Sequence, residues 1–240
     1  NNTRHVLPSY LIDRPSVYYR RISMRVIKDA DVRKNEILDA ATILFAEKGA
    51  DHTSVADIMT AVGLAKGTLY HHFKSKEEIM DALIERQTSV LLKKAKMAAG
   101  DQSMPVNERM LRTVLALHMD TEQTEGREMI RHLHEPQNAL MHEKTKRIIF
   151  RQVPAIMAGI VEDGIAQGIF DAPYPLESME MALCYLDVML DDNILKLGKT
   201  QRSEKIRAFL CLLERLLGAE SGELTELEAA FQASESKSSI

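Results

Sequence analysis

Apolar residues recur in this chain at spacings of three and four, and this helical period is the feature that most restricts its fold. The first clear example is the face formed by Ile37, Ala40, Ala41, Leu44 and Phe45, which one side of an α-helix brings together. The period continues along the chain, and no stretch alternates between apolar and polar residues as a half-buried strand does. With 11 Gly and 7 Pro in 240 residues, few positions interrupt helices, and the sequence predicts an all-α fold.

Capping signals predict where the first helices begin and end. Gly49 ends the first helix as a C-terminal cap. Thr53 or Ser54 caps a short second helix that runs to Val62. Gly63 then makes a tight turn, so the next helix is expected to lie close to the second.

A further short helix is expected at residues 65–73, followed by a long one. Ser75 and Glu78 form a capping box that begins a helix running to about residue 98. Residues 100–105 are interpreted as a linker. Later helices are expected at 106–122, 126–134, 137–167, 176–197, 202–218 and 223–232.

These boundaries divide the chain into four parts. Residues 1–24 have no helical period and contain two prolines, which predicts an irregular extension. A three-helix helix-turn-helix head occupies residues 25–76, and a larger helical domain occupies 77–232. The Ser-rich residues 233–240 are expected to form a disordered tail.

The net charge of −4 is unevenly distributed. Residues 1–76 carry 12 Lys and Arg against 8 Asp and Glu, a balance of +4, so the remainder carries −8. A basic front and an acidic rear favour a front that meets a polyanion.

Two short helices joined by a tight turn can place the second in the major groove of DNA, which is about 12 Å wide. That helix presents Lys66, Thr68, Tyr70 and His71 outward. Gly67 has no Cβ, so its backbone can approach DNA closely. Lys76 lies at the start of the following helix, where it can contact a phosphate.

The stretch from Arg33 to Ile79, with the core VGLAKGTLYHHFKSKEEI, closely resembles the DNA-binding domain of TetR/AcrR-type transcriptional regulators. The resemblance covers about 47 ordered positions and is highly specific. In the rest of the chain, the phrase GIAQGIFDAP at 164–173 is similar to the junction between the seventh and eighth helices of many members.

The resemblance implies a homodimer with a DNA-binding head and an effector-binding body, and no cofactor. Members read a palindromic operator on double-stranded DNA, usually as repressors, and a small molecule in the body releases them. The DNA contacts of the family correspond here to Thr53, Ser54, Lys66, Gly67, Thr68, Tyr70, His71 and Lys76.

Soft apolar residues at inward positions of the later helices are expected to hold a small, largely apolar effector. The predicted lining is His118, Met119, Met129, Leu133, Phe150, Met157, Met181, Tyr185 and Met189. His118 and Tyr185 are the polar groups in this set. The alternative is a solid core without a cavity, which the same residues would fill equally well.

Two apolar stripes in the last long helices predict a dimer interface built as a four-helix bundle. The first stripe is Met179, Leu183, Leu186 and Leu190, and the second includes Phe209, Leu213 and Leu216. The alternative is that both stripes serve only the core of their own subunit.

Other classes of site find little support. His118 and Glu122 share a helix face while His132 and His134 point apart, so no metal site is expected. Cys184 and Cys211 are expected to be buried and inert in a reducing cytoplasm.

Three kinds of protein stay open at this point. The first is a ligand-responsive repressor, and the second is a DNA-binding architectural protein controlled by a protein partner. The third, an α-helical enzyme with an incidental helix-turn-helix, lacks a phosphate loop, a nucleophile elbow and an HExxH motif, so no enzyme activity is expected. No transmembrane span and no membrane partner are expected.

Overall fold

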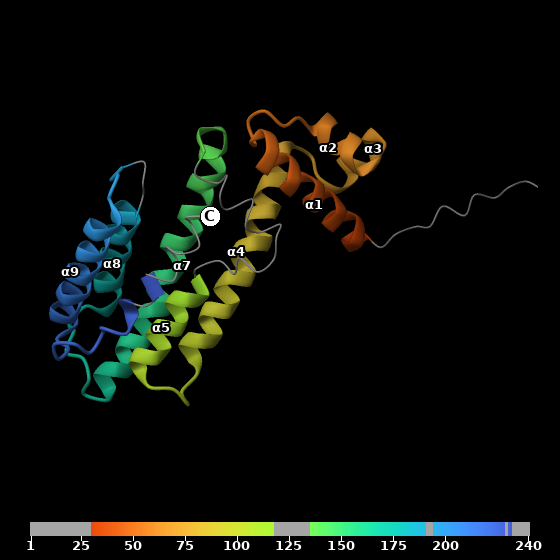
Figure 1. Cartoon of the computed structure of the whole chain (residues 1–240). Coiled ribbons are helices and arrows are strands. Elements are labelled where there is room, and N and C mark those ends of the chain that lie inside the picture. The colour runs from red at the N-terminus through yellow and green to blue at the C-terminus, as the bar shows by residue number, and fades with distance from the viewer. Residues whose placement is uncertain (1–29, 118–134, 191–193, 229, 232–240) are drawn as a thin grey trace, which may run out of the picture.

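The computed structural model describes residues 30–117, 135–190, 194–228, 230 and 231, and they form a head and a larger body. The head contains α1 (Ala30–Lys48), α2 (Val55–Val62) and α3 (Lys66–His72), and α4 (Lys76–Gly100) leads from it into the body (Figure 1). The body contains α5 (Val106–Leu117), the 3-10 turn η1 (Pro136–Asn138), α7 (Ala139–Ala166), α8 (Pro175–Leu190) and α9 (Lys199–Leu217). No strand occurs in these residues, and the prediction of an all-α fold is confirmed.

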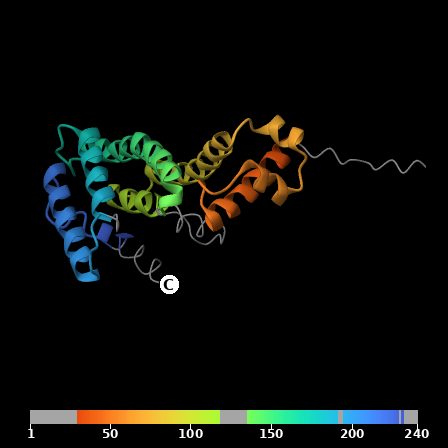
Figure 2. The same ribbon diagram turned by 90° about the horizontal axis from the view of Figure 1, so that it is seen from above.

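The head and the body lie at opposite ends of α4. Both views place α8 and α9 on the side of the body that is farthest from the head (Figures 1 and 2). Within the described residues, no helix has an apolar run long enough to cross a bilayer.

Side-chain caps fix the helix-turn-helix. The Ser54 hydroxyl accepts a hydrogen bond from the Asp57 N–H (3.1 Å), and the Asp57 carboxylate accepts one from the Ser54 N–H (2.8 Å). This capping box begins α2, and Gly63 ends it with a left-handed φ of +68°, which glycine adopts without strain. Ser75 begins α4 by accepting a hydrogen bond from the Glu78 N–H (3.1 Å).

A small apolar core holds the head together. Phe45 of α1, Ile58 of α2, Leu69 of α3 and Leu83 of α4 are each at most 1% exposed and belong to one cluster. Burial of each such side chain contributes roughly 1.5–3 kcal/mol. Since Leu83 belongs to this core, α4 is part of both the head and the body.

A second core fills the body between α4, α5, α7, α8 and α9. In the chain segment that follows α7, the Phe170 ring packs closely against Gly164, where a Cβ would overlap the ring. The Asp171 N–H then donates to the Leu217 carbonyl (2.8 Å), which joins this segment to the end of α9.

Some helix ends differ from the sequence prediction. The helix predicted at 176–197 ends at Leu190, and residues 194–198 are not helical although their apolar spacing continues. Gly198 adopts an extended conformation and begins α9. Residues 223–226 of the helix predicted at 223–232 form turns instead, and the helix predicted at 126–134 lies outside the described residues.

The buried Arg109 of α5 joins the C-terminal ends of α4 and α7 by hydrogen bonds. Its side chain is 2% exposed, and its Nε donates to the Ala99 carbonyl (2.8 Å) near the C-terminus of α4. Its Nη1 donates to the Gln102 side chain (3.3 Å) and its Nη2 to the Asp163 carboxylate of α7 (2.6 Å). A cation at this position also satisfies the free carbonyls of the helix end.

Asp163→Asn should destabilise the fold in a pH-dependent way. Hydrogen bonds from Gln102 and then Arg109 lower the pKa of Asp163 below its ordinary value of 3.8. A carboxyl whose pKa is lower in the folded state stabilises that state above the unfolded pKa and stops doing so as pH falls through the folded pKa. Because the carboxyl is 38% exposed, we expect a loss of only about 1 kcal/mol in the free energy of unfolding at neutral pH.

Urea unfolding followed by circular dichroism at a series of pH values measures this effect. The difference between the native chain and Asp163→Asn should shrink as the pH falls below 3.8. Glu162→Gln, an exposed neighbour on α7, serves as the control and should unfold like the native chain. A deficit of Asp163→Asn that stays constant down to acidic pH would contradict the assignment.

Candidate nucleic-acid interface and effector cavity

The helix α3 presents a continuous polar surface at the tip of the head. Lys66, Gly67, Tyr70 and His71 are exposed and Thr68 is partly exposed. The Lys66 ammonium lies 5.9 Å from the centroid of the Tyr70 ring, within the range of a cation–π contact. No atom lies within 4 Å of the position of a Cβ at Gly67, so another molecule can approach the backbone there.

Thr53 is placed differently from its predicted role as a DNA contact. Its side chain is 1% exposed, and its hydroxyl donates to the Gly49 carbonyl (2.8 Å), with a longer contact to the Leu44 carbonyl (3.2 Å). Both carbonyls lie at the C-terminal end of α1. Its hydroxyl therefore closes the C-terminus of α1 and is not available to a phosphate.

Ser54 is exposed but its hydroxyl is engaged by its own helix. The hydroxyl donates to the Asp57 carboxylate (2.7 Å) while the capping box holds the backbone. These two hydrogen bonds from Ser54, followed by the nearby Lys48, lower the pKa of Asp57. Asp57 therefore keeps the start of α2 ordered in its ionised form.

Lys76 reaches the loop between α1 and α2. Its Nζ donates to the Ala50 carbonyl (2.8 Å) from the first turn of α4. The Nζ also donates to the Asp51 carbonyl (3.5 Å). Since an ammonium has three N–H donors, one remains for the phosphate contact that the sequence predicts.

Residues far along the chain hold the same loop from its other side. The Asn138 side chain, 3% exposed, accepts from the Ala50 N–H (2.7 Å) and donates to the Phe45 carbonyl (3.4 Å). The Gln137 carbonyl accepts from the Asp51 N–H (3.1 Å). Nothing in the local sequence indicates these contacts, which join η1 of the body to the head.

Gly49 permits this close approach. Its φ is +83°, and a Cβ there would overlap the Gln137 side chain. Gly49, which the sequence predicts as the C-terminal cap of the first helix, therefore also packs directly against η1.

A cavity of about 460 Å³ lies in the body between α4, α5, α7, α8 and α9. Phe150 and Met157, two residues of the predicted effector lining, form part of its wall. The wall is mostly apolar, as a site for a small apolar molecule requires. The cavity favours a ligand-binding body over the solid core that the sequence left open.

Other residues of the predicted lining do not face this cavity. Met181 is 63% exposed, and Tyr185 is 42% exposed with its ring stacked on Phe209 at 5.5 Å between centroids. Met189 is 1% exposed and packs in the core away from the cavity wall. His118, Met119, Met129 and Leu133 lie outside the described residues.

Most of the predicted dimer stripe lies inside the subunit. Met179, Phe209 and Leu213 are between 4% and 6% exposed, and together with Leu183 and Leu186 they line the cavity. Leu216 is exposed at 38%, and the side chain of Leu190 lies outside the described part. This corrects the prediction for Met179, Phe209 and Leu213, which pack into the core of their own subunit, whereas Leu216 stays exposed.

The opposite sides of α8 and α9 carry exposed apolar residues. We call this surface the outer face, and it comprises Met181, Cys184, Tyr185, Val188, Cys211, Leu212 and Leu216. Both cysteines are exposed free thiols, which corrects the expectation that they are buried. The sequence could not show this, because both helices are apolar on two sides.

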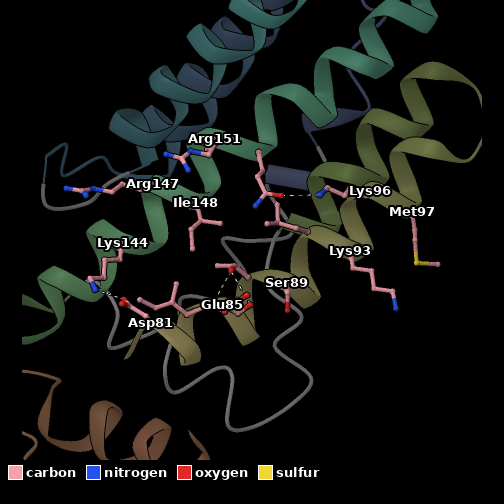
Figure 3. Close-up of a pocket in the computed structure, with 14 residues that line it drawn as sticks. Asp81, Glu85, Ser89, Lys93, Lys96, Met97, Lys144, Arg147, Ile148 and Arg151 are labelled. Carbon is pink, nitrogen blue, oxygen red and sulfur yellow. Dashed lines mark hydrogen bonds and ion pairs between the residues drawn. The ribbon is translucent and has the colours of Figure 1, made fainter. Parts of the chain in front are cut away.

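A second hollow lies on the outside, between α4 and α7. This open groove of about 920 Å³ is crossed by the ion pair of Asp81 with Lys144 and by a hydrogen bond from Lys96 to Gln152 (3.1 Å) (Figure 3). Ile148 points into the space between the helices. The ion pair links α7 to the half of α4 next to the head, and the hydrogen bond links it to the half in the body.

The sequence predicts no metal site among four potential ligands. These residues lie outside the described part of the chain: His118, Glu122, His132 and His134. Among the residues that are described, no three His, Cys, Asp or Glu side chains gather as a metal site would require.

A helix-turn-helix head on a helical body with an internal cavity defines a class of DNA-binding regulators. Residues 37–83 match the family model of bacterial regulatory proteins of the tetR family, and residues 122–212 match that of the tetracyclin repressor-like C-terminal domain. The chain therefore belongs to the TetR family, whose members are DNA-binding transcription factors and not enzymes.

Curated relatives match through the head. The transcriptional repressor KstR2 of Mycobacterium tuberculosis is 45% identical over 60 residues, which is 25% of this chain and 30% of the relative. This chain therefore covers less than a third of the relative's length.

Solved structures match over most of the chain. SmeT, the repressor of a multidrug efflux pump of Stenotrophomonas maltophilia, has a TM-score of 0.60 at 19% identity, covering 79% of this chain and 92% of SmeT. PfmR of Thermus thermophilus has a TM-score of 0.50 at 26% identity, covering 78% of this chain and 96% of PfmR. The likeness to SmeT shows the shared fold of head and body.

Asn138→Ala should destabilise the junction between body and head. It leaves the Ala50 N–H, on a residue 1% exposed, without its partner, and we expect a loss of about 2 kcal/mol in the free energy of unfolding. Urea denaturation measures the loss. Gln137→Ala keeps the backbone bond to Asp51 and should cost clearly less, whereas equal losses would show that the Asn138 amide is not the important contact.

Proposed function

We propose that this protein is a transcriptional repressor that binds a palindromic operator on double-stranded DNA as a homodimer and is released by a small, largely apolar effector. The observation that carries the proposal is the path of α4. Its first turn carries Lys76 beside the head's loop, and Thr88 and Leu91 of the same helix line the cavity. The distance between Lys76 and Leu91 along the helix is about 22 Å at 1.5 Å per residue.

The exposed surface of α3 supports the DNA-binding half of the proposal. Thr68 and Lys66 lie in its first turns, which a recognition helix directs at base edges. Tyr70, His71 and Lys76 flank them and supply donors for phosphates. KstR2 and SmeT are named as repressors, which favours repression over activation.

The cavity supports the ligand-controlled half of the proposal over control by a protein partner. A ligand that fits the cavity in only one arrangement of α4 and α7 shifts the population of that arrangement. The shift is useful only if affinity differs between the states, and a preference of ~1.4 kcal/mol gives tenfold release.

The outer face supports a homodimer. Helices α8 and α9 present adjacent apolar surfaces, and two copies of this pair form a four-helix bundle. A symmetric dimer would match the two-fold symmetry of a palindrome.

Lys76→Ala and Thr68→Ala should affect DNA binding in different ways. Lys76→Ala removes one phosphate contact per subunit, so binding to all sequences weakens and the log–log salt slope of the dimer falls by about two. Thr68→Ala should instead change base preference at one position per half-site by ~1–3 kcal/mol.

Selection of the operator from random DNA, followed by titrations of operator and random DNA at several salt concentrations, tests these expectations. Lys93→Ala removes the same charge from an exposed site in the body and should leave the slope unchanged. If no palindrome is selected, the proposed function fails. If Thr68→Ala weakens operator and random DNA equally, Thr68 does not read a base.

Val188→Asp should weaken the dimer. Val188 is 45% exposed on the outer face, and dimerisation would bury the new carboxylate without a partner. Light scattering at micromolar protein should show a shift toward monomer mass. Val90→Asp makes the same change at a 55% exposed valine of α4 and should stay dimeric, and dissociation of both variants or of neither would place the interface elsewhere.

A further inference from the structure

The cavity in the body has one polar end. Along α7 its wall changes from polar residues, His142, Thr145 and Lys146, to apolar ones that end at Met157. The wall residues of α7 from His142 to Met157 span about 22 Å, with the polar residues at one end of this length and Met157 at the other. Asp187 of α8 belongs to the same end, since it pairs with Lys146, and Gln87 and Thr88 are the polar residues that α4 contributes to the wall.

The two charges at this end are paired with each other. The Lys146 Nζ lies 2.6 Å from the Asp187 carboxylate, and the two side chains are 33% and 26% exposed. The Thr88 and Thr145 hydroxyls donate to the Ile84 (2.8 Å) and Met141 (2.9 Å) carbonyls of their own helices, so on the wall they present uncharged acceptor oxygens. Gln87 adds an uncharged amide. The polar end is therefore dipolar, with an acceptor and a donor side by side and no net charge from this pair.

The other end of the cavity is soft and apolar. Its wall includes Met110, Met157, Met179, Phe209, Leu213 and Phe231. The Phe209 and Phe231 rings meet edge to face at 6.3 Å, and thioether and aromatic surfaces accept flat or irregular hydrocarbon groups well.

We infer that the cavity binds an uncharged amphipathic molecule, a hydrocarbon ring system or chain with one hydroxyl or carbonyl group, whose polar group lies at the Lys146–Asp187 pair. A hydroxyl donates to Asp187 and accepts from Lys146 without breaking the pair. A carboxylate at the same place would lie against Asp187, and its burial beside an already neutralised lysine would not be compensated. A pure hydrocarbon would leave the polar end without a ligand partner.

This inference rests on the proposed function and adds the chemistry and the orientation of the effector. The polar end is formed by the part of α4 and α7 nearer the head, because Gln87 and His142 precede the apolar wall residues of their helices. The polar group of the ligand therefore lies closer to the head than its hydrocarbon part.

Three probes that share one rigid skeleton test the inference: biphenyl, 4-biphenylmethanol and biphenyl-4-carboxylate. Calorimetric titration of all three probes at one fixed pH measures their affinities. We expect the alcohol to bind most tightly, about tenfold more tightly than the carboxylate, the size of effect that a hydrogen bond to a charged group produces. Asp187→Asn removes the repelling charge and leaves Lys146 unneutralised, so the carboxylate should gain about tenfold relative to the alcohol.

Glu180→Gln is the matched control, because Glu180 is an exposed carboxylate of the same helix and is not on the cavity wall. It should keep the native order of affinities. If the carboxylate binds the native chain as tightly as the alcohol, or if Asp187→Asn leaves the order unchanged, the inference is overturned while the cavity remains a ligand site. If none of the three probes binds, both the inference and the proposed ligand control fail, whereas operator binding tests the DNA-binding half separately.

Discussion

The stiffness of α4 is the constraint on which the rest of the structure depends. Its first turns lie in the core of the head through Leu83, and its later turns line the body's cavity through Leu91. A helix of 25 residues without a proline or an internal glycine transmits displacement along its axis better than a loop does. The contacts that the later turns of α4 make in the body therefore set the position of the head.

Polar contacts restrain both ends of this helix. At the C-terminal end, the buried Arg109 of α5 donates to the Ala99 carbonyl of α4 and to the Asp163 carboxylate of α7. At the near end, Lys76 and Asn138 hold the loop after α1 from two sides. Between them, the Asp81–Lys144 ion pair and the Lys96–Gln152 hydrogen bond join α4 to α7. Movement of α4 relative to α7 would have to break some of these contacts, so the two helices are restrained against free movement past each other.

The sequence predicted what local chemistry determines. Helix period, the Ser54 and Ser75 caps and the Gly63 turn act within a few residues, so the helix-turn-helix and its exposed α3 could be predicted from the chain alone. Which side of α8 and α9 faces the core could not be predicted. Leu213 and Leu212, for example, are adjacent apolar residues, of which the first is buried and the second 60% exposed. Only packing against other helices decides between two apolar sides. The contact of Asn138 with Ala50 joins residues 88 positions apart, and no local pattern encodes it.

The close packing of η1 against Gly49 limits which segments of this protein can be replaced by those of a relative. Asparagine often replaces glycine where the backbone is left-handed, yet here its Cβ would overlap Gln137. A head taken from another regulator and joined at residue 76 would carry its own loop and meet a foreign η1. A chimaera that preserves the native junction must therefore transfer residues 30–76 together with Pro136–Asn138, two segments that the chain separates but the fold joins.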